Sequence, residues 1–268
     1  MTVNEKIAAL RAAAQANGAD GVLVMTSDPH CSEYVPAYYN ALPWLTGFIG
    51  ENATLVVTGS ESALWVDGRF YVQADKQLAG TEIQSMHAGA AGVPTVAEFL
   101  TQKFSAGQTL LLDGSCVPTA TVRDYAKTLE KVGASLRSLD VVSSIWGGER
   151  PALPNTPCFL LKKEVPGADA AEKIAAVRAE LAKEGANALA VTGLDCVAWL
   201  LNMRAHDLPC TPLAVSYAYI TADSCTLFLA PGRLSEEDAA ALAAQGVALR
   251  DYTELLDFVR RRTDEETI

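Results

Sequence analysis

The sequence predicts an α/β fold that is present twice, and two observations carry this prediction. Residues 5–24 recur as residues 172–191 at a constant offset of 167, and ten of these twenty aligned positions are identical. In each copy a stretch with helical spacing is followed by a short apolar run typical of a buried strand. A repeat with so long a period indicates two domains and not a solenoid, whose repeats are far shorter.

Both copies begin with a helix whose start is marked by residue type. Thr2 stands three residues before Glu5, and Asp169 stands three residues before Glu172 at the same offset of 167. Such pairs form reciprocal caps, in which each side chain accepts a hydrogen bond from a backbone amide that the helix leaves unpaired. We expect the first helix over residues 2–17.

The rest of the first half alternates between apolar runs and helical patterns. The predicted elements are strands over 21–25, 53–57, 63–66, 109–112 and 136–139, and helices over 69–78 and 122–132. The turn residues between 57 and 63 predict that the second and third strands form a hairpin. We expect the helix over 69–78 to pack through Phe70, Val72 and Ala74 or their neighbours.

Prolines and glycines concentrate in residues 146–157, where each proline removes an amide donor and restricts the residue before it. We place the domain link here, which gives a first domain over 1–147 and a second over 148–268. The predicted elements of the second domain are helices over 170–183, 235–244 and 253–260, strands over 188–191, 214–220 and 225–229, and an apolar helical segment within 194–204. The tail over 261–268 is charged and has no helix-stop signal, and we expect it to be part of a linker.

Composition restricts the class of partner. With 21 basic and 32 acidic residues the chain carries a net charge of −11, which repels phosphate groups, so we expect neither nucleic acid nor membrane as a partner. Residues 1–20 lack the pattern of a secretion signal, and no apolar run approaches the length of a membrane span, which favours a cytoplasmic protein. The six cysteines never form a Cys-x-x-Cys pair, and we expect no disulfide.

Spacing alone indicates no catalytic site. The three histidines, His30, His87 and His206, are far apart, and each is interpreted as a satisfied surface or loop histidine and not as a metal ligand. Phosphate-binding, nucleophile-elbow and dinucleotide-binding motifs do not occur. The four tryptophans are expected in the core or at a domain interface, because aromatic burial is strongly stabilising: Trp44, Trp65, Trp146 and Trp199.

Two local residue patterns are nevertheless more specific than expected by chance. The first joins Asp28-Pro29-His30-Cys31-Ser32-Glu33-Tyr34, Trp44-Leu45-Thr46-Gly47-Phe48-Ile49-Gly50 and Leu64-Trp65-Val66-Asp67-Gly68-Arg69-Phe70, and the second joins residues 194–204 with 212–218. At these residues the sequence resembles the amino-terminal half of Xaa-Pro aminopeptidases of the three-domain type. The resemblance runs through essentially the whole chain in one order.

This resemblance implies two homologous domains similar to the creatinase amino-terminal domain, each a mixed sheet flanked by helices. In that family a third, carboxy-terminal pita-bread domain binds two divalent metal ions, usually manganese, and removes an amino-terminal residue that precedes proline. Its signature is missing from this chain, so the resemblance implies a non-catalytic fragment that is inactive alone and holds no metal. The implied partners are a peptide with proline at its second position, the protein's own catalytic domain and further copies in a homo-oligomer.

One family role matches a residue of this chain. The arginine of the Asp-Gly-Arg turn is associated with substrate binding in the family, and it corresponds to Arg69. A guanidinium at such a turn can donate several hydrogen bonds to a peptide carbonyl or carboxylate, although pairing with Asp67 or another surface acid is the alternative. His30, Ser32, Glu33 and Tyr34 are expected either to face the substrate cleft or only to brace their loop.

The chain departs from the family pattern at two places. Where the family often has Gly-Phe-x-Gly-Ser-Ala-Gly-Thr, residues 47–54 read Gly-Phe-Ile-Gly-Glu-Asn-Ala-Thr, and Ala205 stands where glycine is common. Two alternatives are kept: a free-standing binding or scaffolding protein that has lost the catalytic domain, and part of a creatinase or proline dipeptidase relative. The reading frame downstream of residue 268 distinguishes these possibilities.

Overall fold

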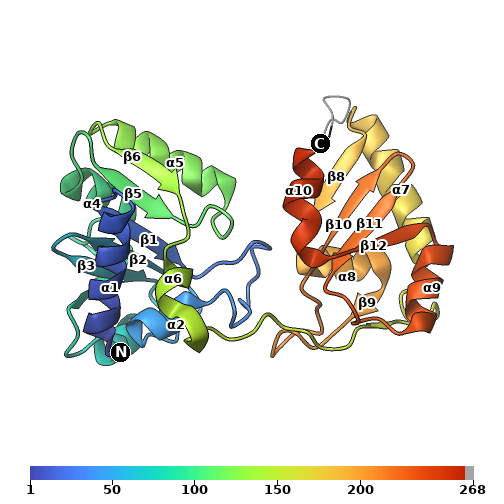
Figure 1. The fold of residues 1–268 in the computed structure, drawn as a ribbon, viewed down its shortest axis with the longest axis horizontal. Coiled ribbons are helices and arrows are strands. Elements are labelled where there is room, and N and C mark those ends of the chain that lie inside the picture. Colours follow the sequence, from blue (N-terminus) through green and yellow to red (C-terminus); the bar gives the residue numbers. More distant parts are fainter. Residues whose placement is uncertain (263–268) are drawn as a thin grey trace. The chain divides into compact units, whose positions relative to one another are not determined.

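The computed structural model describes residues 1–262, and their contacts divide the chain into two compact units, Met1–Ala152 and Leu153–Ile268. The division lies within the proline- and glycine-rich residues 146–157. Each unit is a mixed sheet flanked by helices, which confirms the predicted fold class (Figure 1). Residues 263–268, most of the predicted linker tail, lie outside the described residues.

The first unit is built on a six-stranded sheet with the order β4-β3-β2-β1-β5-β6. The central strands β1, β2 and β3 are antiparallel neighbours, whereas β4, β5 and β6 join the sheet in parallel. Its strands are β1 (Gly21–Met25), β2 (Ala53–Thr58), β3 (Ser62–Val66), β4 (Ile83–His87), β5 (Thr109–Leu112) and β6 (Ser135–Ser138). Its helices are α1 (Val3–Ala16), α2 (Ala41–Thr46), α3 (Tyr71–Gln77), α4 (Val96–Lys103), α5 (Thr119–Glu130), α6 (Val142–Trp146) and the 3-10 turn η1 (Gly147–Glu149).

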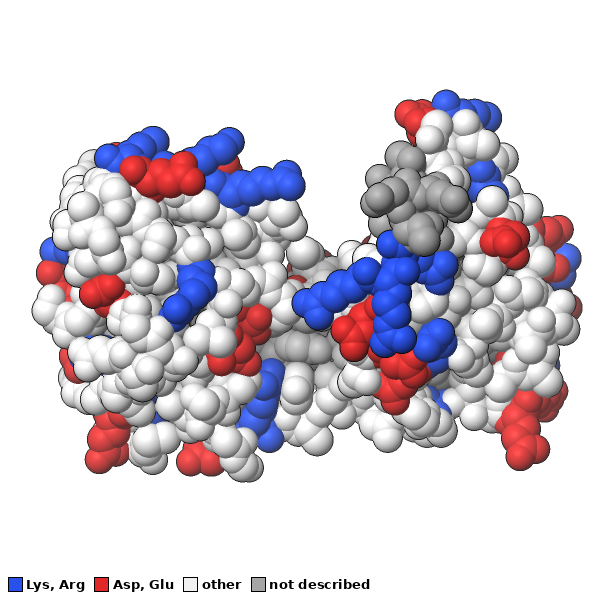
Figure 2. All heavy atoms as spheres, turned by 45° about the horizontal axis from the view of Figure 1, so that its top comes forward, with Lys and Arg blue, Asp and Glu red and all other residues white. Residues whose placement is uncertain are grey.

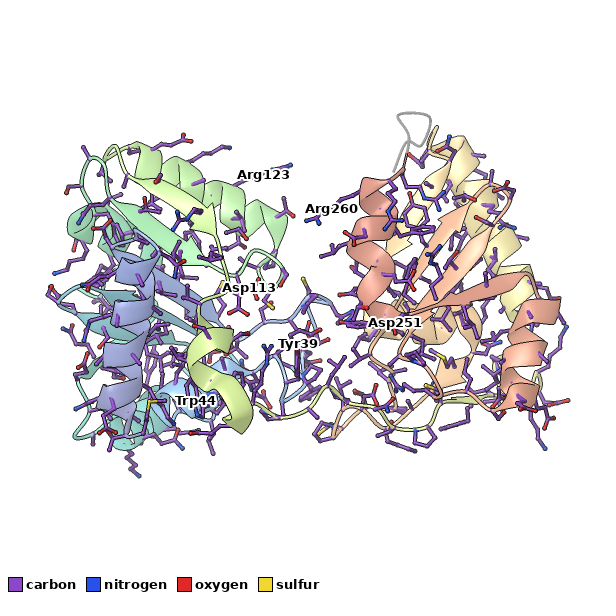
Figure 3. All side chains as sticks on the ribbon, in the orientation of Figure 1. Tyr39, Trp44, Asp113, Arg123, Asp251 and Arg260 are labelled. Atoms are coloured by element: carbon purple, nitrogen blue, oxygen red, sulfur yellow. The ribbon has the colours of Figure 1, made fainter. Side chains whose placement is uncertain are left out.

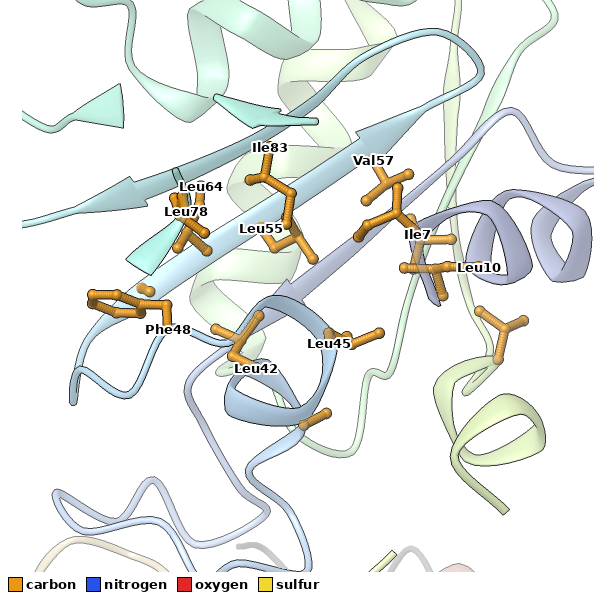
Figure 4. Close-up of a cluster of buried hydrophobic side chains, with 14 of the residues drawn as sticks. Ile7, Leu10, Leu42, Leu45, Phe48, Leu55, Val57, Leu64, Leu78 and Ile83 are labelled. Carbon is orange, nitrogen blue, oxygen red and sulfur yellow. The ribbon is translucent and has the colours of Figure 1, made fainter. Parts of the chain in front are cut away.

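Helices cover both faces of this sheet, because successive strand residues point to opposite sides. One core contains Ile7 and Leu10 of α1 and Leu45 of α2 packed on Leu55 and Val57 of β2 (Figure 4). The other core lies on the opposite face, where residues of α4 and α5 pack on alternate residues of the same strands, as the burial of Leu23, Val56, Phe99, Leu110 and Leu129 shows.

The second unit has a four-stranded sheet with the order β12-β11-β10-β8 and a separate two-stranded ladder of β7 and β9. Its strands are β7 (Phe159–Leu160), β8 (Ala188–Val191), β9 (Met203–Arg204), β10 (Ser216–Thr221), β11 (Cys225–Leu229) and β12 (Val247–Arg250). Its helices are α7 (Ala170–Lys183), α8 (Leu194–Leu201), α9 (Glu236–Ala244), α10 (Leu255–Arg260) and the 3-10 turn η2 (Tyr252–Glu254). A buried pair of Asp207 and Arg233, with 2.6 Å between Oδ2 and Nη2, ties Thr156 and Val215 into this unit.

The internal repeat is visible as matched contacts in the two units. Thr2 and Asp169 both form the expected capping boxes with the glutamate three residues on. Arg11 Nε donates to the carbonyl of Thr58 at 2.8 Å, and its counterpart Arg178 donates to the carbonyl of Thr221 at 2.7 Å. The duplicated sequence therefore makes duplicated tertiary contacts and not only duplicated helices.

Several elements differ from the expectation. The strands β4 and β12 and the helices α2, α4 and α6 were not predicted. Of the residues expected to pack the helix over 69–78, Ala74 is buried and Phe70 packs against the core, but Val72 is 67% exposed because two positions two residues apart point to different sides of a helix. Trp199 was expected in the core or at a domain interface; it is 53% exposed in the described structure and so does not lie in the core.

Candidate functional site

The sheet order of the first unit brings three loops together at one end of the sheet. Residue 25 at the end of β1 pairs with residue 54 at the start of β2, and residue 53 pairs with residue 66 at the end of β3. The loops over 26–40, 47–52 and 67–70 therefore leave the sheet side by side. They contain most of the residues that carry the family resemblance in this unit.

In the Asp-Gly-Arg turn the guanidinium of Arg69 is held by two hydrogen bonds to the carboxylate of Asp67. Arg69 Nε donates to Asp67 Oδ1 at 3.0 Å and Nη2 donates to Asp67 Oδ2 at 2.8 Å, while the Arg69 amide also donates to Oδ1. Asn52 Nδ2 reaches the same carboxylate at 3.5 Å, which links the turn to the loop over 47–52. Arg69 thus pairs with Asp67, as the alternative interpretation anticipated, yet its side chain remains 65% exposed.

Asp67 and Arg69 form an ion pair in this turn, and further carboxylates lie near the guanidinium. The hydrogen bonds from the Arg69 guanidinium lower the pKa of Asp67 to about 2. The same contact raises the pKa of Arg69, with smaller contributions from the carboxylates of Glu51 and Glu33. Glu51, one of the departures from the family pattern, therefore adds negative charge close to the guanidinium.

The loop over 47–52 is held by local packing. Gly47 ends α2 in the left-handed conformation with a φ of 77°, and the Ile49 amide donates to Gln77 Oε1 at 3.1 Å. A β-carbon at Gly50 would overlap the ring of Phe48, which is fully buried. Glycine at position 50 is thus required by the close approach of this ring. The exposed side chain of Ile49 stands at the tip of the loop.

Asp28 organises the loop after β1. It is 1% exposed, and its Oδ1 accepts the amides of His30 at 2.9 Å and Ser32 at 3.0 Å. The His30 side chain is itself 3% exposed, so in the described chain this residue lies inside the loop. Its role toward substrate stays a prediction. Sequence reasoning missed the bracing role of Asp28, although an aspartate followed by proline at a strand end is a turn signal.

A small cavity of about 50 Å³ lies beside this site, at the ends of β1, β5 and β6. Asp113 follows β5 and Tyr39 lies in the loop before α2, and both line the cavity (Figure 3). Arg150 closes one side, with its Nε donating to the Tyr38 carbonyl at 2.8 Å and its guanidinium lying 3.7 Å from the centre of the Tyr38 ring. The cavity has room for about a water or two and not for a peptide.

Charges elsewhere on the chain are mixed in sign. Figure 2 shows acidic and basic side chains interspersed on the face it presents. Near the last helix of the second unit Arg250 pairs with Glu254 at 2.5 Å and Arg260 with Asp257 at 3.5 Å. The positive charges of Arg250 and Arg260 are therefore partly neutralised by these acidic neighbours.

Within residues 1–262 no group of three or more His, Cys, Asp or Glu side chains could hold a metal ion. The family resemblance places its metal pair in a carboxy-terminal domain outside this chain, and no chemical step through a metal is assigned to the described residues. Over the same residues, no helix combines the length and apolar character needed to cross a bilayer. The six cysteines are free thiols, and burial raises the pKa of Cys116 to about 12.

Two mixed α/β modules in tandem, the first with an Asp-Gly-Arg turn at its converging strand ends, define the class of protein to which the chain belongs. The chain belongs to the creatinase/prolidase N-terminal domain family, which matches residues 6–143 and, in a second form of the same domain, residues 149–268.

The similar proteins are peptidases that are much longer than this chain. A probable Xaa-Pro aminopeptidase P of Sordaria macrospora is 35% identical over 260 residues, which are 95% of this chain and 42% of that protein. Aminopeptidase P2 of Arabidopsis thaliana is 31% identical over 265 residues, covering 96% of this chain and 37% of that protein. The chain therefore spans about two fifths of the length of these relatives.

A solved structure shares both units. The X-prolyl aminopeptidase of Caenorhabditis elegans, described as a cytosolic enzyme with a di-nuclear active site, matches with a TM-score of 0.92 and 30% identity. The match covers 97% of this chain and 44% of that one.

Proposed function

We propose that this chain is the amino-terminal, non-catalytic region of a metal-dependent Xaa-Pro aminopeptidase. The observation that carries the proposal is the similarity over 95% of the chain to Xaa-Pro aminopeptidases, which include both modules and extend well beyond them. The longer protein acts in the cytoplasm and removes the amino-terminal residue of a peptide whose second residue is proline. Two divalent ions, expected to be manganese, would be held by the catalytic domain outside this chain and would supply Lewis-acid chemistry there.

In this protein Arg69 positions the substrate peptide. Asp67 occupies its Nε and Nη2, which fixes the plane of the guanidinium and leaves the N–H groups of Nη1 for a peptide carbonyl or carboxylate. The exposure of the side chain supports this role, because a ligand can reach it without rearrangement. Arg69 acts by binding and orientation, and His30 stays a second candidate within the adjacent loop.

The test is a substitution in the longer protein. Arg69→Ala should lower kcat/KM for an Xaa-Pro peptide by about tenfold or more, since one charge-assisted hydrogen-bond site is lost, while metal content stays unchanged. Arg69→Lys should restore only part of the loss, because lysine cannot form the fork to Asp67.

Arg123→Ala is the matched control, because Arg123 is an exposed arginine on α5 in the same unit (Figure 3). It should leave kcat/KM unchanged. Equal kinetics for Arg69→Ala and the unmodified protein would remove the proposed role of Arg69.

The domains are also proposed to shape the entrance to the active site and to support a homo-oligomer. Sedimentation of the longer protein with and without residues 1–268 measures this contribution. Loss of the oligomer on their removal is the expected result, and an unchanged oligomer would contradict it.

A further inference from the structure

The loop over 26–40 joins β1 to α2 without a helix or strand of its own. Its first part is fixed by Asp28, whose carboxylate accepts two backbone amides of the loop. Glu33, in the middle of the loop, is close enough to the Arg69 guanidinium to raise the pKa of that arginine. The middle of this loop therefore lies beside the arginine to which substrate binding is assigned.

The side chains of the loop leave part of its own interior unsatisfied. Within residues 1–262, seven buried side-chain oxygen or nitrogen atoms have no hydrogen-bond partner, and four of the seven belong to this loop: Thr26 Oγ1, Asp28 Oδ2, Ser32 Oγ and Asn40 Oδ1. A buried polar atom without a partner costs stability and does not hold the backbone around it. A long loop of this kind depends on contacts from outside to keep one conformation.

Arg150 supplies such a contact at the end of the loop. Its Nε donates to the Tyr38 carbonyl at 2.8 Å, and its guanidinium lies 3.7 Å from the centre of the Tyr38 ring. Its Nη1 donates to Ser143 Oγ on α6. The Tyr38 ring in turn meets the Tyr39 ring edge-on, with 4.8 Å between the centroids. One side chain therefore joins α6 to the last residues of the loop.

The segment that carries Arg150 is itself anchored in the first core. Trp146, at the end of α6, is 5% exposed and stacks on Trp44 of α2, with 5.5 Å between the ring centroids. Trp44 Nε1 donates to Glu149 Oε2 at 2.7 Å, and Lys6 Nζ lies 4.6 Å from the centre of the Trp44 ring. The guanidinium of Arg150 thus connects a segment fixed to the core with a loop that is not.

We propose that Arg150 is a positioning residue for the substrate site, which it serves by fixing the loop over 26–40 through Tyr38. Arg150 does not touch the substrate. It keeps the middle of the loop beside Arg69 before the substrate arrives. Without it the loop occupies other conformations as well, and the apparent affinity falls by the fraction of molecules in which the loop is still in place. The inference rests on the proposed function, because the role it assigns is in substrate binding.

Steady-state kinetics of the longer protein test this role. Arg150→Ala should raise KM for an Xaa-Pro peptide about threefold or more and leave kcat within about twofold, because saturating substrate restores the ordered loop. Arg150→Lys should fall between the two, since a lysine can donate to the Tyr38 carbonyl but cannot bond Ser143 at the same time through a planar fork. An unchanged KM for Arg150→Ala would overturn the proposal, and so would a lower kcat at an unchanged KM.

Arg137→Ala is the matched control. Arg137 of β6 also donates to a backbone carbonyl of the first unit, that of Asn17. Asn17 lies before the start of β1, at the opposite end of the sheet from the loop over 26–40. The control should leave KM unchanged. If KM rose as much in Arg137→Ala as in Arg150→Ala, the cause would be a general loss of stability and the positioning role would be wrong.

Hydrogen exchange of chain 1–268 tests the loop without catalysis. The amides of Tyr39 and Asn40 both donate to the Pro36 carbonyl, so they report on order at the end of the loop. In Arg150→Ala these two amides should exchange about tenfold faster, while the amides of β1 keep their rates. Equal exchange of Tyr39 and Asn40 with and without the substitution would contradict the hold of Arg150 on the loop.

The two measurements separate this inference from the proposed function. Peptidase activity with an unchanged KM and unchanged exchange in Arg150→Ala would keep the proposed function and refute the positioning role. Faster exchange in Arg150→Ala, together with a longer protein that does not cleave Xaa-Pro peptides, would refute the proposed function and the substrate role with it, and would leave only the contact between Arg150 and the loop.

Discussion

At the scale of single residues, the Asp-Gly-Arg turn reconciles the two interpretations of Arg69. Pairing with Asp67 is compatible with the proposed substrate role, because the carboxylate takes one edge of the guanidinium and fixes its plane. A fixed donor loses little conformational entropy when a ligand binds. The acidic neighbours Glu33 and Glu51 favour the charged guanidinium further.

The pH dependence of this pair follows from the pKa of Asp67, which its hydrogen bonds lower from 3.8 to about 2. Because the folded pKa lies below the unfolded one, the pair stabilises the turn fully above about pH 4, and this contribution is lost as the pH falls toward 2. Carbon-detected NMR titration of chain 1–268 should therefore find Asp67 ionised throughout pH 4–8. In Arg69→Ala the midpoint should move up toward the ordinary value; an unmoved midpoint would contradict the assigned cause.

Gly50 offers a second test at this scale. Gly50→Ala forces the buried Phe48 ring to move and should cost about 1–3 kcal/mol, as overpacking does elsewhere. Gly59→Ala, in the hairpin between β2 and β3, meets no atom within 4 Å and should stay within about 0.5 kcal/mol. Thermal unfolding of chain 1–268 measures both. Similar melting temperatures for the two variants would show that the loop over 47–52 is not packed as described.

At the scale of elements, one lysine joins the first helix of each unit to a second helix. Lys6 reaches the end of α2, and Lys173 reaches the end of α8. Lys173 is buried and also donates to Asn202 Oδ1 at 2.5 Å, whereas the first unit has Gly47 at that cap. The lysine of the second unit therefore makes one more hydrogen bond than its counterpart in the first unit.

This difference predicts unequal costs for the same substitution. Lys173→Met leaves Asn202 Oδ1 and a carbonyl without their donor and should cost about 1–3 kcal/mol in the second unit. Lys6→Met removes one hydrogen bond from a half-buried site and should cost about 0.5–1.5 kcal/mol in the first unit. Native-state hydrogen exchange, which reports on each unit separately, measures both. A larger cost for Lys6→Met would contradict the account.

The elements that sequence analysis located share strong local signals. The helix over 170–183 and the strand over 188–191 agree with α7 and β8, because a capping box and a continuous apolar run mark them. The edge strand β4 was missed because Ile83–His87 is mostly polar and only partly buried, so it lacks an apolar pattern. The helix α2 was missed because it is short and contains Pro43.

The candidate site was predictable only in part, for a related reason. The turn containing Arg69 could be located, because Asp-Gly-Arg follows an apolar run. That the loops over 26–40 and 47–52 lie beside it depends on the strand order β3-β2-β1, which no local pattern encodes. The bracing by Asp28 and the exposure of Trp199 likewise depend on which elements come together in space.

At the scale of the whole molecule, the two units have separate cores and no described cluster of metal ligands, and they match proteins more than twice as long. Each unit has one exposed feature at which a longer protein can be bound. The first unit presents the guanidinium of Arg69 at its converging loops, and the second presents the half-exposed ring of Trp199 in an apolar groove lined by α7, α8 and β8.

The account is tested most directly by cleavage of an Xaa-Pro peptide in the presence of manganese, with chain 1–268 and the complete product of its gene assayed side by side. We expect the complete product to release the amino-terminal residue and chain 1–268 to show no release above the uncatalysed rate. Release by chain 1–268 at an enzymatic rate, or a complete product that ends at residue 268, would contradict the account.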